Sequence, residues 1–293
     1  MMTVETRDLT LRYGETTALD GLSFALDGGK IYGLLGRNGS GKSSLLSVLA
    51  AFRKADEGDV LFDAGPVFEN PPITSQIALI REGVDVADTS HKIERVLDFA
   101  SCYRPNWDAD YAAHLLGAFE LDPKKKVKEL SRGKQSALGA VLGLAARTPL
   151  TMFDETYLGM DAPSRYRFYD AILDDYIAHP RTIIISTHLI EEVARIFEEV
   201  VIIDKGRLVL HEPVETLTAR GATVTGPAES VEAFASGQTV LNERQLGRTK
   251  SVMIYGELTD EQRLLARETG LDLEPIPLQD LFVYLTNSKG GAQ

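Results

Sequence analysis

The sequence predicts an α/β fold with a small α+β segment behind it, and three observations carry that prediction. Short apolar runs recur at 150–153, 182–186 and 199–204, each separated from the next by a helical pattern, as in parallel strands joined by crossover helices. A buried strand, a glycine loop and a helix follow one another across 31–52. After about residue 218 this rhythm stops, and the composition shifts to Gly, Thr and Ala.

The composition narrows the class of protein before any motif is considered. With 293 residues, of which 44% are hydrophobic and 25% charged, the disordered, collagen and coiled-coil classes are excluded. The longest uncharged apolar stretch, 135–146, is far shorter than the ~20 residues of a membrane-spanning helix. A lone cysteine, Cys102, and no apparent signal peptide favour a cytosolic protein. The net charge of −12 argues against a nucleic-acid partner.

The first strands and the first helix are predicted from local periodicity. Residues 4–14 alternate between apolar and polar side chains, which is typical of a strand, and 22–26 repeat the pattern. The apolar run 31–35 has the length of a fully buried strand. Beyond Gly41, apolar residues recur at steps of three and four, which indicates a helix. Residues from about 91 to 147 are predicted to be mostly helical.

A glycine-rich motif lies between the predicted buried strand and helix. Residues 36–43 match the pattern GxxxxGK[ST], whose glycines let backbone N–H groups turn inward around a phosphate. Lys42 can reach the terminal phosphates, and the Ser43 hydroxyl can ligate Mg²⁺. The strand–loop–helix context disfavours the competing interpretation, a plain glycine-rich turn. The nucleotide-binding residues predicted from this motif are Gly36, Asn38, Gly39, Ser40, Gly41, Lys42, Ser43 and Ser44.

Two carboxylates follow a second apolar run. Leu150 to Phe153 lead directly into Asp154 and Glu155. Ligands of open parallel sheets bind beyond the carboxyl ends of the strands, so both carboxylates are expected near the phosphate motif. We expect Asp154 to hold Mg²⁺ together with Ser43, and Glu155 to polarise the attacking water. An acidic helix cap would explain either carboxylate alone, but it explains the pair poorly.

Two further motifs complete a recognisable series. Leu-Ser-Arg-Gly-Lys stands at 130–134, and Ser-Thr-His at 186–188, at the end of another predicted strand. In this order and spacing, the set resembles the nucleotide-binding subunit of ATP-binding cassette (ABC) transporters over roughly residues 2–215. The resemblance implies an ABC-type P-loop NTPase fold. Such a fold has a mixed or parallel sheet core, an N-terminal antiparallel β part and a helical subdomain at about 91–147.

The resemblance also implies roles for individual residues. Tyr13 would stack on adenine. Ser131 and Gly133 belong to the signature loop, which contacts the γ-phosphate held by the opposite subunit. Asp161 matches the loop that crosses the dimer interface, and His188 matches the switch histidine that contacts the γ-phosphate. The catalytic set implied in this way is Glu155, His188 and Lys42.

The sequence departs from the family's pattern at three places. The signature is LSRGK where LSGGQ is commoner, so Arg132 and Lys134 add positive charge beside the expected phosphates. That charge either strengthens the anion contact or perturbs the loop. Thr156 stands where the family usually has a proline. The family's loop glutamine has no clear match; Glu82 is nearest in position and is a candidate metal ligand, although an exposed loop residue is equally compatible.

The boundary near residue 218 predicts two domains, an ATP-binding domain at 2–218 and an accessory domain at 219–293. Strands near 222–225 and 251–255, with helices near 229–235 and 260–268, give the second domain an α+β pattern. A regulatory or dimer-supporting role is the hypothesis for it. The segment 277–286 resembles the closing segment of ATPases from drug- and antibiotic-export systems, and a short packed helix is the competing interpretation.

The function expected from the resemblance is an ATPase subunit that binds ATP and Mg²⁺ and docks on a separate integral membrane permease. The subunit would lie on the inner face of the cell membrane, and two such subunits, identical or not, would close around ATP. Export is favoured on analogy alone. A soluble ABC-superfamily ATPase of DNA repair, chromosome organisation or translation is the alternative. The single phosphate loop, the absence of a long heptad insertion and the acidic charge disfavour it. A small-molecule kinase is disfavoured by the signature and His188.

Overall fold

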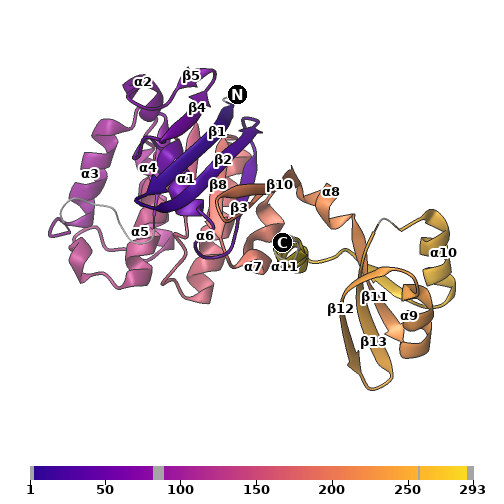
Figure 1. Ribbon diagram of the computed structural model, residues 1–293. Coiled ribbons are helices and arrows are strands. Elements are labelled where there is room, and N and C mark those ends of the chain that lie inside the picture. The colour runs from indigo at the N-terminus through magenta and orange to yellow at the C-terminus, as the bar shows by residue number, and fades with distance from the viewer. Residues whose placement is uncertain (1–2, 82–88, 257, 289–293) are drawn as a thin grey trace. The chain divides into compact units, whose positions relative to one another are not determined.

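Contacts divide the chain into two compact units (Figure 1). The computed structural model describes residues 3–81, 89–256 and 258–288. The first unit consists of residues 1–189 and 195–211, and the second of 190–194 and 212–293. Each unit has a buried apolar cluster of its own, so each is described by itself.

The first unit opens with an antiparallel sheet of strand order β2-β1-β4-β5. The central strand β1 pairs with β2 and β4, so that Val4 lies opposite Leu26 on one side and Phe62 on the other. Leu9 and Leu22 are fully buried between the sheets, which is the cause of the alternation visible in the sequence. The strands are β1 (Val4–Tyr13), β2 (Thr16–Leu26), β4 (Glu57–Phe62) and β5 (Gly65–Pro66).

The second sheet of the first unit has the order β10-β9-β3-β8-β7-β6, and β3, β6, β7, β8 and β9 run parallel, which confirms the predicted α/β core. Every residue of β3, β7 and β8 is buried. Leu35 at the end of β3 pairs with Thr187, and Asp154 at the end of β7 pairs with Ser186. The residues that follow these strands therefore share one edge. The strands are β3 (Ile31–Leu35), β6 (Ile77–Ile80), β7 (Leu150–Asp154), β8 (Thr182–Thr187), β9 (Glu199–Asp204) and β10 (Arg207–Pro213).

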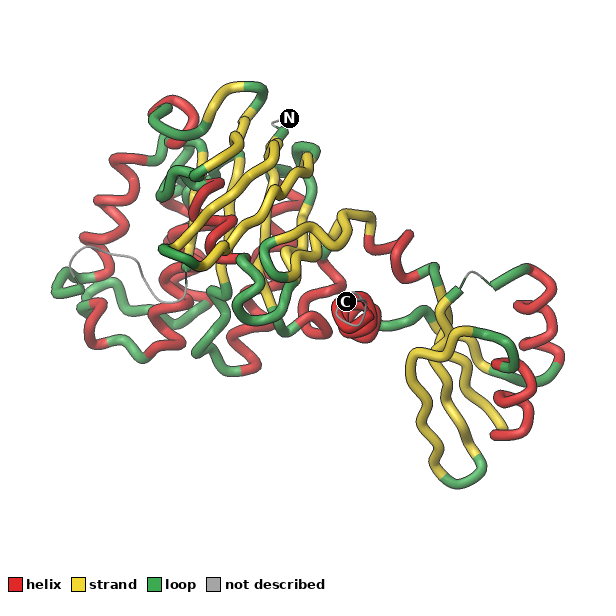
Figure 2. Tube along the Cα trace, viewed as in Figure 1, coloured by secondary structure: helices red, strands yellow, loops and turns green. Residues whose placement is uncertain are grey.

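Helices connect these strands (Figure 2). The helices α3, α4 and α5 lie inside the predicted helical stretch 91–147. Side chains that follow polar or glycine-rich loops start the longer helices: Asp108, Ser131 and Asp161 accept the backbone N–H three residues further on. The helices are α1 (Lys42–Leu49), α2 (Pro71–Thr74), α3 (Ile93–Tyr103), α4 (Ala109–Ala118), α5 (Arg132–Ala145) and α6 (Ala162–Ala178), with 3-10 turns η1 (Val127–Glu129) and η2 (Ala194–Ile196).

The second unit is built around an antiparallel sheet of order β12-β13-β11-β14. In chain order its elements are β11, α9, β12, β13, α10 and β14, the βαββαβ arrangement of ferredoxin-like domains. Val231 of α9 and Ala266 of α10 join Val224 and Ile254 of the sheet in one buried cluster. The strands are β11 (Gly221–Pro227), β12 (Thr239–Leu246), β13 (Thr249–Tyr255) and β14 (Asp272–Glu274), and the two helices are α9 (Ala228–Ala235) and α10 (Asp260–Glu268).

Three more helices belong to the second unit. They are α7 (Ile190–Val193), α8 (Val214–Thr218) and α11 (Leu278–Ser288), and α11 contacts both of the others. The segment 277–286 thus forms most of a helix, in line with the simpler of its two interpretations. The sequence analysis missed β12 and β14, because β12 is an exposed edge strand with little apolar alternation and β14 has only three residues.

Candidate functional site

The glycine-rich motif forms the loop between β3 and α1. Lys42, the first residue of α1, is 6% exposed, and its Nζ donates to the carbonyl oxygens of Gly36 at 2.8 Å and Arg37 at 3.3 Å. Burial lowers the pKa of Lys42, and the carboxylates of Glu155 and Asp154 oppose that shift. A buried ammonium held by the carbonyl oxygens of the phosphate loop is suited to the charge of a triphosphate.

Gly41 is a position where the loop tolerates no side chain. Its φ of +105° lies in the left-handed region, and a Cβ there would lie 2.5 Å from the carbonyl oxygen of Ala18. The close approach of β2 to the start of α1 therefore requires glycine. The second glycine of the GxxxxGK[ST] motif is thus required by its contact with β2.

The acidic pair stands at the end of β7, as the sequence predicts. Asp154 is 6% exposed and accepts a hydrogen bond from Ser186 Oγ at 2.8 Å. Glu155 has a φ of +48°, a left-handed conformation that costs a non-glycine residue about 1–3 kcal/mol. Its Oε1 lies 3.8 Å from Lys42 Nζ. The strained backbone turns the Glu155 carboxylate toward the phosphate loop.

His188 follows β8 and meets the same carboxylate. Its Nδ1 lies 3.3 Å from Glu155 Oε1 and 3.1 Å from the hydroxyl oxygen of Tyr157. The backbone N–H of His188 donates to that hydroxyl as well, at 3.1 Å. Lys42, Glu155 and His188 therefore form one chain of contacts. Sequence reasoning missed Tyr157, although a bulky aromatic residue two positions after the acidic pair was a visible signal.

A cavity of about 390 Å³ opens over the phosphate loop. Tyr13 at the end of β1 stands at its border, 42% exposed, with its hydroxyl 3.4 Å from Ser44 Oγ. The guanidinium of Arg53 lies over the Tyr13 ring, 4.3 Å from its centroid. Ser40 and Gly36 are buried, and neither lines the cavity. The lining residues are Tyr13, Thr16, Thr17, Ala18, Asn38, Gly39, Gly41, Lys42, Ser43, Ser44 and Glu155.

Two oxygen donors at this edge fit a magnesium ion. Ser43 lines the cavity and carries a hydroxyl, and Asp154 carries a carboxylate at the end of β7, which is separated from β3 by β8 alone. Mg²⁺ in phosphate-transfer sites takes one or two protein oxygens and completes its shell with phosphates and water. Within residues 3–81, 89–256 and 258–288, no three His, Cys, Asp or Glu side chains form a metal cage. The third candidate ligand, Glu82, lies outside the described residues.

The residues expected to act across a dimer gather on a different surface. Ser131 caps α5, and a Cβ on Gly133 would lie 2.5 Å from the carbonyl oxygen of Gly159, so the signature turn packs directly on the loop that leads to Asp161. Asp161 caps α6, and its pKa is lowered by hydrogen bonds from Ser164. Among the residues described, none of these three lines the cavity over the phosphate loop.

The structure explains two departures from the family's pattern. Lys134 does not stand free beside the phosphate-facing turn: its Nζ donates to the carbonyl oxygen of Phe119 at 2.6 Å and lies 3.4 Å from a carboxylate oxygen of Glu120. It therefore caps the carboxyl end of α4. Thr156 donates from its hydroxyl to the carbonyl oxygen of Ile80 at 2.9 Å, which ties the acidic loop to the end of β6.

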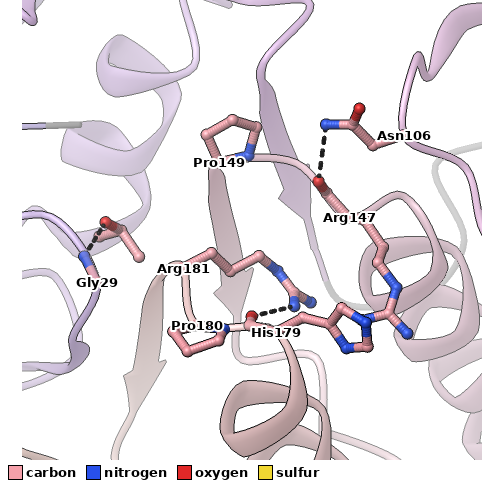
Figure 3. Close-up of a pocket in the computed structure, with 8 residues that line it drawn as sticks. Gly29, Asn106, Arg147, Pro149, His179, Pro180 and Arg181 are labelled. Atoms are coloured by element: carbon pink, nitrogen blue, oxygen red, sulfur yellow. Dashed lines mark hydrogen bonds between the residues drawn. The ribbon is translucent and has the colours of Figure 1, made fainter. Parts of the chain in front are cut away.

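A second cavity, of about 400 Å³, lies at the opposite edge of the parallel sheet, where β7 and β8 begin (Figure 3). Arg147, His179 and Arg181 line it, and Asn106 donates to the carbonyl oxygen of Arg147 at 3.3 Å. Behind them Asp175 is fully buried and pairs with both arginines. The charges of this cavity are compensated internally, and none of the sequence motifs reaches it.

Known proteins are similar to this chain in sequence and in fold. The family model described as "ABC transporter" matches residues 19–157. The ABC transporter ATP-binding protein YtrB of Bacillus subtilis is 31% identical over 192 residues, which is 66% of this chain and 65% of YtrB. The methionine import ATP-binding protein MetN of Rhizobium johnstonii is 31% identical over 87% of this chain and 77% of its own length.

A third relative matches both units. The Nod factor export ATP-binding protein I of Burkholderia lata is 28% identical over 97% of this chain and 96% of its own length. Among solved structures, an ATP-binding subunit of an ABC transporter superposes with a TM-score of 0.66 at 23% identity, covering 73% of this chain and 91% of that one. An Atm1-family ABC exporter with ATP bound gives a TM-score of 0.63 at 20% identity, over 75% of this chain and 40% of that one.

Proposed function

Because the chain belongs to the ABC transporter family of ATP-binding subunits, which hydrolyse ATP to drive transport, we propose that it couples the closure of an ATP-bound dimer to export by a separate membrane permease. The single observation that carries the proposal is the chain of contacts from Lys42 through Glu155 to His188, at the edge where β3, β7 and β8 end. The cavity at this edge is lined both by the phosphate loop and by Glu155, the proposed general base.

The residues of the site divide the reaction between them. Backbone N–H groups of the phosphate loop and Lys42 bind the phosphates, and Tyr13 stacks on the base. Ser43 and Asp154 would hold Mg²⁺, which when bound neutralises part of the phosphate charge. Glu155 accepts a proton from water as the water oxygen bonds to the γ-phosphorus, and the bond from that phosphorus to the bridging oxygen of ADP breaks.

The signature residues act in the partner's site. We assign Ser131, Gly133 and Asp161 to the dimer interface, where each protomer completes the nucleotide cavity of the other. A closed dimer then depends on the γ-phosphate, and hydrolysis releases it. The partner ATPase is a second copy or a different subunit. The soluble-ATPase alternative predicts no membrane partner, so co-purification of a multi-span permease from detergent extracts would distinguish the two.

A groove in the first unit suits a helix of that permease. It has a volume of about 330 Å³ and is lined by residues of β6, α3 and α5. Phe52, Phe99 and Tyr103 line it while they remain 58%, 64% and 64% exposed, which is unusual for aromatic residues of a subunit that acts alone. None of the described helices is long and apolar enough to cross a bilayer. We expect Phe99→Ser to weaken co-purification of the permease, whereas Phe68→Ser outside the groove leaves it unchanged.

The proposal includes the direction of transport, which is export, and a location of the subunit on the inner face of the membrane. The Nod factor export protein of Burkholderia lata is matched over 96% of its own length, whereas the methionine import protein of Rhizobium johnstonii is matched over 77% of its own length. Uptake of candidate cargo into inside-out membrane vesicles on addition of ATP would support export from the inner face of the membrane. Uptake into right-side-out vesicles would support import instead. The accessory domain, proposed at 219–293, then has a regulatory or dimer-supporting role.

Nucleotide binding itself is tested by Lys42→Ala. Loss of a buried charge-assisted contact costs about 1.5–3 kcal/mol, so ATP affinity should fall by roughly 10- to 100-fold in isothermal titration. Lys124→Ala, which removes a lysine from an exposed loop, is the matched control and should bind ATP as the unmodified chain does. Equal ATP affinity in both variants would remove the phosphate-loop assignment.

A further inference from the structure

The loop between Glu155 and Asp161 contains a tyrosine whose hydroxyl lies between the base and the histidine. Tyr157 is 1% exposed, and its ring packs 5.8 Å from the ring of His188, centroid to centroid. Burial raises the pKa of Tyr157, so the phenol keeps its proton across the physiological range. Tyr157 is therefore a hydrogen-bond donor as well as an acceptor at this point.

Two atoms of His188 lie within hydrogen-bond distance of the Tyr157 hydroxyl, and their chemistry indicates which atom donates. The backbone N–H of His188 can only donate, and it donates to the phenol oxygen at 3.1 Å. The phenol keeps its own proton, and His188 Nδ1, an atom that can accept that proton, lies 3.1 Å from the phenol oxygen.

Nδ1 has a second neighbour that competes for it. Glu155 Oε1 lies 3.3 Å from Nδ1, and a carboxylate can only accept. If Nδ1 carried the ring proton, it would bond to Glu155 and occupy the base. If Nδ1 accepts from Tyr157, the proton lies on Nε2 and the carboxylate is left beside Lys42, at 3.8 Å. The two arrangements exclude each other.

We propose that Tyr157 is a positioning residue that donates to Nδ1 of His188, holds that ring in the Nε2–H tautomer and so keeps the Glu155 carboxylate available for the proton of the attacking water. The inference rests on the proposed hydrolysis at this site. The Nε2–H group of a neutral ring can donate to a phosphate oxygen, as a γ-phosphate contact requires. Tyr157 thus acts through His188 and Glu155 and touches no reacting atom.

The tautomer can be measured without any turnover. Ring-nitrogen NMR of the ¹⁵N-histidine-labelled chain at about pH 8, where an ordinary imidazole is neutral, should show His188 with an unprotonated Nδ1 and a protonated Nε2. Loss of the signal in His188→Gln assigns it among the five histidines. A protonated Nδ1 in the unmodified chain would overturn the proposal. This result stands whether or not the protein hydrolyses ATP, so it is independent of the proposed function.

Kinetics then test the consequence. Tyr157→Phe keeps the ring and removes the hydroxyl, so the kcat for ATP should fall by about 10- to 100-fold, as for other partners that fix a histidine tautomer. KM should change less than about twofold, because the binding contacts remain. Tyr169→Phe, which removes an equally buried hydroxyl from α6, is the control and should keep its kcat.

A double-mutant cycle separates positioning from a general packing effect. In a His188→Ala background, Tyr157→Phe should cause no further loss of kcat, because the residue through which it acts is gone. An equal loss in both backgrounds, or an unchanged kcat in Tyr157→Phe alone, would contradict the proposal. If Tyr157→Phe does not fold, the tautomer measured in the unmodified chain decides the question.

Discussion

The two units differ in how their sheets direct polar groups. In the first unit, β3, β7 and β8 run parallel, so the residues after all three strands come to one edge, where Lys42, Glu155 and His188 meet. In the second unit, neighbouring strands are antiparallel, and successive strand ends fall on opposite sides. A site assembled from strand ends is therefore available to the first unit and not to the second.

The ion pairs of the two units differ in the same sense. Asp175 of the first unit is fully buried and pairs with Arg147 and Arg181. In the second unit, Lys250 pairs with Glu232 at 2.9 Å and with Glu243 at 3.1 Å, and both carboxylates are about 60% exposed. The carboxylate of Asp175 is thus shielded from water, whereas the two carboxylates that pair with Lys250 are mostly solvated. Each prediction that follows tests one side of this contrast against the other.

The largest effect, a loss of kcat for ATP hydrolysis, is expected on substitution of Glu155, the proposed general base. Glu155→Gln keeps the size of the side chain and removes its ability to accept a proton, so kcat should fall by roughly 10²- to 10⁴-fold while ATP still binds. The ATP-bound dimer should then accumulate and elute earlier in size exclusion. Glu229→Gln on the exposed surface of α9 in the second unit is the control and should hydrolyse ATP at the unmodified rate.

The Glu155 variant also decides between partners. A monomer in the presence of ATP would exclude the homodimer and leave a heterodimer with a different ATPase. A normal kcat in Glu155→Gln would remove Glu155 from the mechanism altogether, and with it the contrast between the two units.

The next effect concerns stability. Arg181→Met leaves the fully buried Asp175 with Arg147 as its partner, so the loss should approach but not reach the about 3–5 kcal/mol of a buried charge that has no partner left. Lys250→Met removes a lysine whose two carboxylate partners are exposed, so its loss of stability should be much smaller. Chemical denaturation followed by circular dichroism measures both changes. Similar losses in the two variants would show that burial does not distinguish the ion pairs of the two units.

The difference between strand ends and tertiary contacts also explains which site residues could be predicted from the sequence. The edge of the first unit was predictable, because the phosphate loop, Asp154 and Glu155 are each contiguous with a short apolar strand. Tyr157 was missed since its role depends on His188, which lies 31 positions later in the chain. The engagement of Lys134 with the end of α4 is equally a matter of tertiary contact, and a lysine in a sequence motif carries no sign of it.

The second unit was less predictable for a physical reason. Its central strands β11 and β13 have buried positions that alternate, and they lie where the sequence places strands. The edge strand β12 has no buried residue, so it lacks the apolar periodicity on which prediction depends. The βαββαβ order becomes visible only when β12 and β14 are paired with their neighbours.

A core substitution tests whether the two units are energetically separate. Val224 of β11 is fully buried in the cluster of the second unit, and Val224→Ala should destabilise that unit by about 2 kcal/mol. If the units fold independently, calorimetry should show one transition moved and one unmoved, with ATP affinity unchanged. A shift of both transitions would show that the units form one cooperative body.

The smallest effect concerns the helix caps and depends on pH. Asp108 caps α4 by accepting the backbone N–H of Tyr111, and it also pairs with Arg147. The hydrogen bond from Tyr111 and the charge of Arg147 lower the pKa of Asp108 in the folded chain. A lowered pKa means that the stabilisation is present above the unfolded pKa of about 3.9 and is lost as the pH falls through the folded value.

Asp108→Asn keeps the capping acceptor and removes only the charge, so it should cost about 0.5 kcal/mol at pH 7, and the difference should be smaller at pH 3, below the unfolded pKa. In the second unit Thr259 caps α10 without a charge, accepting from the backbone N–H of Gln262 at 3.2 Å. Thr259→Ser should therefore change stability equally at both pH values. Urea unfolding at the two pH values measures all four differences. A difference for Asp108→Asn that is as large at pH 3 as at pH 7 would mean that its cause is geometry, as at Thr259, and not charge.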